Sequence, residues 1–364
     1  MKLAHLLASA ALATMLGACN AVQSKAQLET PVDYVNPYMG NISHLLVPTF
    51  PTIHLPNSML RVYPERGDFT TDQLKGLPLI VTSHRGSSAF NLSPYQGTEF
   101  TPVINYSYDA EVLKPYYYET YLDDDQIQVK YAPSHQSALY QIDYEQDGKP
   151  VYMILNSRNG AIKAGNGFVS GYQQLENNTR VYLYMESDVV PQEAGILADG
   201  KIDTNRKEAE GHNACAVLRF ADGTKTVNLR YGISFISEEQ AKKNMQRELP
   251  DYNLQALADK GRQIWNDALS DITVEGGSED DKQILYTSLY RVFERPVCIS
   301  EDGRYFSAFD GKVHEDEGEP FFTDDWIWDT YRAAHPLRLL IDEGTEKNVI
   351  DSYLRMAEQM GDMW

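Results

Sequence analysis

The sequence predicts a chain of more than one domain, in which an antiparallel β-sandwich is followed by helices. From about residue 31 to 236, hydrophobic residues recur with a period of two, and turn signals such as "EQDGKP" and "FADGT" separate the short runs. At Ser237 the period changes from two to 3.6, which is typical of amphipathic helices. This order favours a β-sandwich domain at residues 31–236 and a helical part after it.

The start of the chain predicts export. A basic Lys2 precedes an apolar run, Leu3–Leu16, which is too short for a membrane span and typical of a signal peptide. Small residues lead up to Cys19, as in a bacterial lipobox. We therefore expect a lipoprotein signal peptide at 1–18, a lipid on the Cys19 sulfur, a tether at 19–30, and a cell-envelope lipoprotein that is periplasmic or anchored to the outer membrane. The alternative is an ordinary signal peptide with a chance cysteine.

Composition excludes some partners. The net charge is −20, from 52 acidic and 32 basic side chains, which argues against nucleic acid and anionic lipid. Contact with a membrane is expected only through the lipid anchor. The 24 tyrosines suit carbohydrate stacking and a sandwich core equally well, because tyrosine combines an apolar ring with a polar tip. Cys215 and Cys298 have apolar neighbours in the sequence and are expected to be buried free thiols.

Several runs carry the strand pattern clearly. They are "QIQVKY" at 126–131, "ALYQIDY" at 138–144, "RVYLYMES" at 180–187 and "TVNLRYGISF" at 226–235. Alternation places one set of side chains of each run on a common face, which we expect to be the core face. In the second and fourth runs these side chains are Ala138, Tyr140, Ile142 and Tyr144, and Val227, Leu229, Tyr231, Ile233 and Phe235.

Residues 237–270 predict a helical linker of two helices. "SEEQ" has the capping-box pattern from Ser237 to Gln240, and Pro250 ends the first helix. Asn253 is the expected N-cap of the second helix. Its apolar stripe consists of Leu254, Leu257, Ala258, Ile264, Trp265, Ala268 and Leu269.

Beyond the linker we expect further helices with short extended segments. "DITVEGG" at 271–277 predicts a strand, Ser278 with Asp281 predicts a helix start, and "SEDGRYFSAFDGK" predicts a loop or hairpin. Two more helices are predicted, one at Thr330–Leu340 and one with its N-cap at Thr345. So few amphipathic helices leave an apolar face without a partner. We therefore expect 271–364 to be the incomplete N-terminal part of an all-α domain, and the chain to be a fragment or one half of a split gene product.

Four segments in the last hundred residues resemble a known family. They are "WNDALSDITVEGGSEDDKQILYTSLYRVFERP", "GRYFSAFDGKVH", "WDTYRAAHPL" and "EQMGDMW", which span about 265–364. Together they are similar to glycoside hydrolase family 92, and "VNPYMG" at 35–40 fits the opening of that family. The chain thus resembles the N-terminal part of such an enzyme.

The resemblance implies an activity and an arrangement of domains. Members of the family are calcium-dependent exo-α-mannosidases that invert the anomeric carbon, and they pair a β-sandwich with an (α/α)6 toroid, with the site between the two domains. It therefore implies Ca²⁺ as cofactor, α-mannoside-containing glycans as partners, and 271–364 as the start of the toroid. The general acid and base of the family lie further along the toroid, so they are expected beyond Trp364 and are assigned to no residue of this chain.

The resemblance also suggests substrate-binding residues in "FFTDDWIWDTYRAAHP". In the family, the Trp-Asp pair that corresponds to Trp328 and Asp329 faces the sugar. A tryptophan ring can cover the C–H face of a sugar, and a carboxylate can accept hydrogen bonds from two neighbouring hydroxyls. The alternatives are that Asp329 caps a helix beginning at Thr330 and that Trp328 belongs to the core. His335 is expected to hold a packing corner.

Other candidates are weaker. His44, His84 and Glu111 are candidate substrate-binding residues on the β-domain side, each with a structural role as the alternative. The metal ligands remain unknown; Asp324 and Asp325 could ligate calcium as hard oxygen donors or could simply be solvated.

The leading interpretation is a fragment of an exported α-mannosidase-like glycoside hydrolase. One alternative is a non-catalytic, lipid-anchored carbohydrate-binding β-sandwich protein. Another is a different glycosidase that only shares the sandwich-and-toroid plan.

Overall fold

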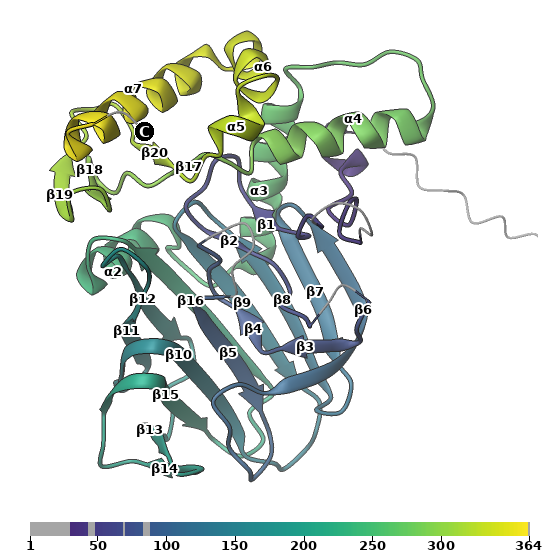
Figure 1. Cartoon of the computed structure of the whole chain (residues 1–364). Coiled ribbons are helices and arrows are strands. Elements are labelled where there is room, and N and C mark those ends of the chain that lie inside the picture. Colours follow the sequence, from purple (N-terminus) through teal and green to yellow (C-terminus); the bar gives the residue numbers. More distant parts are fainter. Residues whose placement is uncertain (1–29, 43–47, 68–69, 83–87, 363–364) are drawn as a thin grey trace, which may run out of the picture.

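The computed structural model describes residues 30–42, 48–67, 70–82 and 88–362, and consists of a large body of strands beneath a group of helices and short strands (Figure 1). The strands of the large body are β1 (Ile53–His54), β2 (Arg61–Val62), β3 (Gln73–Lys75), β4 (Leu77–Pro78), β5 (Phe90–Tyr95), β6 (Asn105–Lys114), β7 (Tyr117–Leu122), β8 (Ile127–Pro133), β9 (Ser137–Tyr144), β10 (Val151–Ala164), β11 (Phe168–Gln174), β12 (Arg180–Ser187), β13 (Glu193–Ala198), β14 (Lys201–Asp203), β15 (Glu208–Phe220) and β16 (Thr226–Ser234).

Fourteen of these strands form one hydrogen-bonded sheet that folds over into an antiparallel sandwich, as predicted. The sheet passes from one layer of the sandwich to the other at β10. The first half of this strand, up to Ser157, pairs with β5, and its second half, from Gly160, pairs with β11, while β15 follows it along both halves. One layer therefore continues from β10 to β5 and β4. The other continues through β11, β12, β16, β9, β8, β7 and β6 to β3.

The predicted alternation of the strands is confirmed. The inward side chains of β9 and β16 lie in one large core cluster with residues of β5 and β13 from the facing layer. Several tyrosines cross this core and end on backbone carbonyls. The Tyr140 hydroxyl donates to the Pro78 carbonyl, and the Tyr231 hydroxyl to the Leu79 carbonyl, each at 2.7 Å. These bonds satisfy one carbonyl of β4 and the carbonyl of the residue that follows it, so these buried tyrosines serve the core and not carbohydrate stacking.

The remaining elements follow the sandwich, apart from a short 3-10 helix at the start of the described chain. They are η1 (Pro31–Tyr34), α2 (Glu238–Glu248), α3 (Leu254–Leu269), α4 (Glu279–Val292), β17 (Val297–Cys298), β18 (Arg304–Ser307), β19 (Lys312–Glu315), β20 (Phe322–Thr323), α5 (Ile327–Thr330), α6 (Ala334–Ile341) and α7 (Glu343–Met360). None of the helices in the described ranges is both long and apolar enough to cross a membrane.

The helix starts follow the local sequence in most places. Ser237 caps α2, Asn253 caps α3, and Ser278 and Asp281 form the capping box of α4. Only half of the predicted box at Ser237 exists, because the Gln240 amide donates to Asn244 and Asp302 instead of reaching back. Of the two structures predicted for "SEDGRYFSAFDGK", a loop or a hairpin, the hairpin is observed, since β18 pairs with β19.

Three predictions differ from the structure in whole or in part. Residues 271–277 form turns and coil, with no strand. The helix predicted at Thr330–Leu340 is divided into α5 and α6 by a turn at 331–333. The last helix begins at Glu343, capped by Asp342, whose carboxylate accepts a hydrogen bond from the Thr345 N–H at 3.0 Å. Thr345 is thus the donor in this cap and does not supply the capping side chain.

The predicted linker and catalytic part share a core. Trp265 and Leu269 of α3 pack with Tyr290 and Phe293 at the end of α4, and with Val32 of η1. The indole N–H of Trp265 donates to the His54 carbonyl at 2.7 Å. This shared core attaches the C-terminal part of the chain to one end of the sandwich.

Candidate functional site

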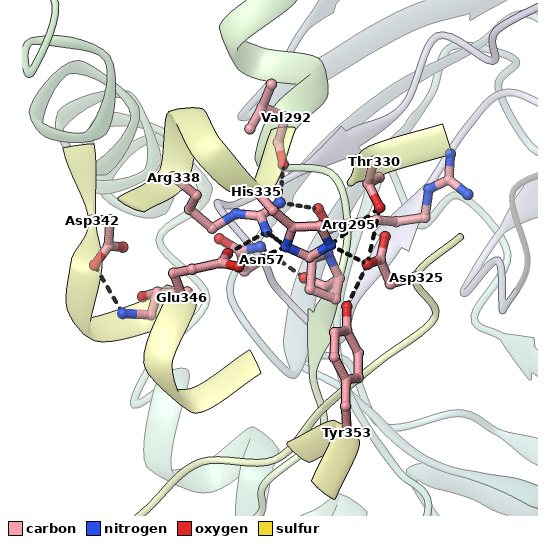
Figure 2. Close-up of polar contacts among 12 residues, drawn as sticks. Asn57, Val292, Arg295, Asp325, Thr330, His335, Arg338, Asp342, Glu346 and Tyr353 are labelled. Carbon is pink, nitrogen blue, oxygen red and sulfur yellow. Dashed lines mark hydrogen bonds and ion pairs between the residues drawn. The ribbon is translucent and has the colours of Figure 1, made fainter. Parts of the chain in front are cut away.

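The candidate site is the short helix α5, which carries Trp328 and Asp329, together with the polar network that holds it (Figure 2). The network joins Asp325, just before α5, to His335 of α6 and to Glu346 and Tyr353 of α7. A helix of four residues has little stability of its own. The orientation of α5 therefore depends on these contacts.

Asp325 is the centre of the network. One carboxylate oxygen accepts the Trp326 N–H at 2.8 Å. The other accepts from His335 Nε2 at 2.9 Å, from the Thr330 hydroxyl at 3.2 Å and from the Tyr353 hydroxyl. Burial acts to raise the pKa of Asp325, but the hydrogen bonds from His335 and Tyr353 outweigh it, so this pKa is lowered. Asp325 is thus a buried anion that connects both ends of α5 to the neighbouring helices.

His335 is a cation between two carboxylates. Its Nε2 faces Asp325 at 2.9 Å, and its Nδ1 faces Glu346 at 2.7 Å. Two acceptors require two N–H donors, which only the protonated ring supplies. The hydrogen bond to Asp325 is the main reason that the pKa of His335 is raised, against the opposing effect of burial. His335 was predicted to hold a packing corner; in the structure it connects Asp325 to Glu346 of α7 through two ion pairs.

Arg338 fixes the far side of the network. Its guanidinium is fully buried and donates to Glu346 at 2.9 Å. It also donates to the backbone carbonyls of Val292 and Arg295, at 3.3 and 3.0 Å. The two cations, Arg338 and His335, balance the two anions, Asp325 and Glu346. The end of α4 is thereby tied to α6 and α7.

Trp328 and Asp329 lie on the surface of α5. Trp328 is 83% exposed, so the alternative that it belongs to the core is wrong for the described structure. Asp329 is also exposed and lies inside α5, where its N–H donates to the Trp326 carbonyl at 2.7 Å. The alternative that Asp329 caps a helix starting at Thr330 is wrong as well, because α5 starts three residues earlier. Both side chains are thus exposed on α5, and their role in binding a sugar stays a prediction.

Glu111 lies on β6 and is already bound by other side chains. Its carboxylate accepts from the Tyr38 hydroxyl at 2.7 Å, from the Tyr118 hydroxyl at 3.1 Å and from Arg66. These partners hold the start of the described chain against β6 and β7. None of these partners belongs to α5. A role of Glu111 in substrate binding stays a prediction. His44, His84 and Cys19 lie outside the described residues.

The structure assigns calcium to none of the described residues. No group of three or more histidine, cysteine, aspartate or glutamate side chains among them could hold a metal ion. Asp324 pairs with the buried Arg61, and Asp325 with His335. Carboxylates that already accept from cations are poor calcium ligands, and Asp325 is not simply solvated either.

Comparisons with known proteins identify the family of the chain. The N-terminal-domain model of glycosyl hydrolase family 92 matches residues 34–234, and the catalytic-domain model of the same family matches residues 240–364. The chain belongs to glycosyl hydrolase family 92 and is thus related to glycoside hydrolases. The resemblance is not limited to the N-terminal domain of the family, since the catalytic-domain model also matches. A different glycosidase that only shares the domain plan is excluded.

Solved structures give the same family. An inverting mannosidase of family GH92 from Bacteroides thetaiotaomicron VPI-5482 superposes with a TM-score of 0.82 and 25% identity, over 93% of this chain and 50% of its own. A GH92 alpha-mannosidase from Bacteroides thetaiotaomicron has a TM-score of 0.81 and 22% identity, over 91% and 50% of the two chains, and shares the fold. The chain spans about half the length of these structures. No curated protein matches the chain.

Proposed function

We propose that the protein is part of an exported, inverting exo-α-mannosidase that removes terminal mannose from glycans. Two observations support the proposal: membership of glycosyl hydrolase family 92 and the likeness to an inverting mannosidase over 93% of this chain. The observation that carries it within the structure is the exposed pair Trp328 and Asp329 on a helix held by a buried ionic network.

In this proposal α5 binds the sugar. The Trp328 ring covers the C–H face of the terminal mannose, and the Asp329 carboxylate accepts from two adjacent hydroxyls. Inverting hydrolysis needs two further carboxyl groups about 6.5–9.5 Å apart, with a water between the base and the anomeric carbon. We place these groups in the half of the relatives' length that this chain does not span. The helices of 271–364 are then the start of an (α/α)6 toroid.

Calcium dependence is a proposal for the complete enzyme, and it is assigned to no described residue. It is tested together with the activity. The complete gene product is incubated with α-mannosides, with and without a calcium chelator, and released mannose is quantified. Proton NMR at early times identifies the first anomer, which is β-mannose for an inverting enzyme. Release that needs calcium and gives β-mannose supports the proposal. Binding of mannosides without release favours the carbohydrate-binding protein instead.

Export and lipidation are tested separately. A cell-envelope lipoprotein incorporates labelled fatty acid and sediments with membranes, and Cys19→Ala loses both properties. Equal incorporation of the label by Cys19→Ala would contradict the lipid anchor and leave the enzymatic proposal intact.

A further inference from the structure

The helix α5 is poorly anchored by apolar packing. It consists of the four residues Ile327–Thr330, and none of them is buried. Trp328 and Asp329 are exposed, while Ile327 and Thr330 are half-buried. A single helical turn is marginal in water unless tertiary contacts hold it. The position of α5 therefore depends on the polar contacts at its two ends.

The Asp325 carboxylate holds both ends of α5 (Figure 2). One of its oxygens accepts the Trp326 N–H, directly before the helix, at 2.8 Å. The other accepts the hydroxyl of Thr330, the last residue of the helix, at 3.2 Å. Displacement of this one carboxylate would therefore release the two ends of α5 together.

His335 is the cation beside Asp325. Its Nε2 lies 2.9 Å from the Asp325 carboxylate and 3.2 Å from the Thr330 hydroxyl, so the ring contacts the carboxylate and α5 at once. The other partners of this carboxylate are neutral, namely the hydroxyls of Thr330 and Tyr353 and the Trp326 N–H. Within the described ranges, His335 is thus the one positively charged group that pairs with Asp325.

The other charged groups around His335 come from α6 and α7. Glu346 of α7 faces Nδ1 at 2.7 Å, and its second oxygen accepts from Arg338 of α6 at 2.9 Å. Arg338 also lies 3.4 Å from Nδ1. Burial raises the pKa of Tyr353, so its hydroxyl remains a donor to Asp325. When the histidine loses its proton, Glu346 therefore keeps a cationic partner, whereas Asp325 loses the one described above.

We propose that His335 is a positioning residue for sugar binding, which holds α5 through Asp325 so that Trp328 and Asp329 are presented to a mannoside. The inference rests on the proposed function. A neutral imidazole carries one N–H and cannot donate to two carboxylates. Loss of the proton thus removes one of the two contacts of His335 and leaves a buried anion poorly compensated. Mannoside affinity then falls with the fraction of molecules in which α5 is held in place.

An NMR titration of the whole chain with methyl α-mannoside, repeated over a range of pH, tests this role. Because the pKa of His335 is raised, its interaction is fully present below the usual value of 6.5 and is lost as the pH rises through the raised pKa. Above this titration the wild type should bind about tenfold more weakly. In the same pH range, ¹⁵N relaxation should show the amides of residues 326–330 becoming more mobile.

The histidine variants separate this effect from other titrations. His335→Gln should bind the mannoside as weakly as the deprotonated wild type, and equally at every pH. His314→Gln is the matched control, because His314 also pairs with an aspartate, at 3.0 Å, but on the β18–β19 hairpin. It should keep the affinity and the pH profile of the wild type.

Thr330→Val tests the position of α5 without breaking the buried ion pairs. It removes the hydroxyl that contacts Asp325 and His335. Binding below the histidine titration should weaken by about 2–10-fold, the effect of one neutral hydrogen bond. The control is Thr204→Val, at an exposed position between β14 and β15, which should bind like the wild type.

The outcomes distinguish the positioning role from the proposed function. Wild-type affinity that stays constant through the titration of His335, with unchanged mobility at 326–330, overturns the positioning role. If Asp329→Ala loses mannoside binding while His335→Gln and Thr330→Val retain it, the proposed function stands and the positioning role fails. If the wild type binds no mannoside at any pH, the proposed function fails for this chain, and the role of His335 in sugar binding fails with it.

Discussion

Two aspartates in and beside α5 differ in their contacts, and this difference separates binding from stability. Asp329, in α5, is exposed and makes no side-chain hydrogen bond within the described structure, whereas Asp325, just before α5, has a side chain that is 2% exposed and accepts four hydrogen bonds. Substitution of the first should therefore change ligand binding, and substitution of the second should change the fold around the site.

Asp329→Ala tests the binding role in the complete enzyme. Loss of charged acceptors for two sugar hydroxyls should lower kcat/KM on the order of a hundredfold. The melting temperature should stay the same, because no intramolecular side-chain contact is removed. Asp342→Ala is the control: it removes the N-cap of α7 and should cost about 1 kcal/mol of stability. An Asp329→Ala variant that melts early and keeps wild-type kinetics would move the residue out of the site.

At the scale of elements, α5 depends on α6 and α7. Its link to them is ionic and buried, with His335 only 14% exposed. Removing one member of a buried charged network leaves the other charges without a partner, which is far more damaging than removing an exposed ion pair.

His335→Gln should therefore lower the free energy of unfolding by about 3–5 kcal/mol. The raised pKa of His335 gives the effect a pH dependence. The contribution of the histidine is fully present below its usual value of 6.5, and it is lost as the pH rises through the raised pKa of the folded state. The difference between wild type and variant, measured by denaturant unfolding, should thus shrink at alkaline pH.

His314→Gln is the control for this series. His314 pairs with Asp310 at 3.0 Å on the β18–β19 hairpin, with the histidine 30% exposed. A pair of this kind contributes at most about 1 kcal/mol. Equal losses of stability in the two histidine variants would contradict the role of the buried network.

At the scale of the whole molecule, a buried carboxyl joins the sandwich to the C-terminal part. Glu301, after β17, accepts the Phe235 N–H at 2.9 Å and the Asn244 amide at 2.7 Å. Burial raises the pKa of Glu301 to about 7, against the lowering effect of the hydrogen bonds from Ser234, Phe235 and Asn244. The folded state thus holds this proton up to a higher pH than the unfolded chain does, because burial disfavours the charged form of Glu301.

The sign of the pH dependence follows from this pKa. Because the folded state holds its proton more tightly than the unfolded state, stability should fall as the pH rises from about 4.5 to above 7, by about 1–3 kcal/mol for this group. Glu301→Gln cannot ionise, so its stability relative to wild type should increase over the same range. Parallel pH profiles of the two proteins in chemical denaturation would contradict the assignment.

The helices also present an apolar surface, as the sequence predicted. Leu339 and Leu340 of α6 and Ile350 and Leu354 of α7 are exposed, with Leu340 at 84%. Exposed apolar patches of this kind promote association.

Leu340→Glu should therefore reduce self-association of the chain and its binding of the dye ANS. The melting temperature should change little, because exposed substitutions usually alter stability by less than about 0.5 kcal/mol. Leu257→Glu, in the buried stripe of α3, is the control that should unfold the protein. Undiminished ANS binding in Leu340→Glu would show that the dye binds elsewhere.

The sequence by itself determined the elements whose signals are local. Strand alternation, the cap at Asn253 and the box at Ser278 and Asp281 depend on residues a few positions apart, so each could be predicted and is confirmed. The candidate pair Trp328 and Asp329 came from a family motif that is also contiguous. Its substrate role stays a prediction.

Only the tertiary structure decided the rest. His335 contacts Asp325 and Glu346, which lie 10 and 11 residues away in the sequence. Tyr353 contacts Asp325 across a sequence separation of 28 residues. No local sequence pattern predicts these contacts, since any of the 52 acidic side chains could have been the partner of His335. The division of the helix predicted at Thr330–Leu340 and the pairing of the second half of β10 with β11 likewise depend on how distant segments pack. Periodicity reports which face of an element is buried, but the choice of the neighbour that buries it is made by packing in three dimensions.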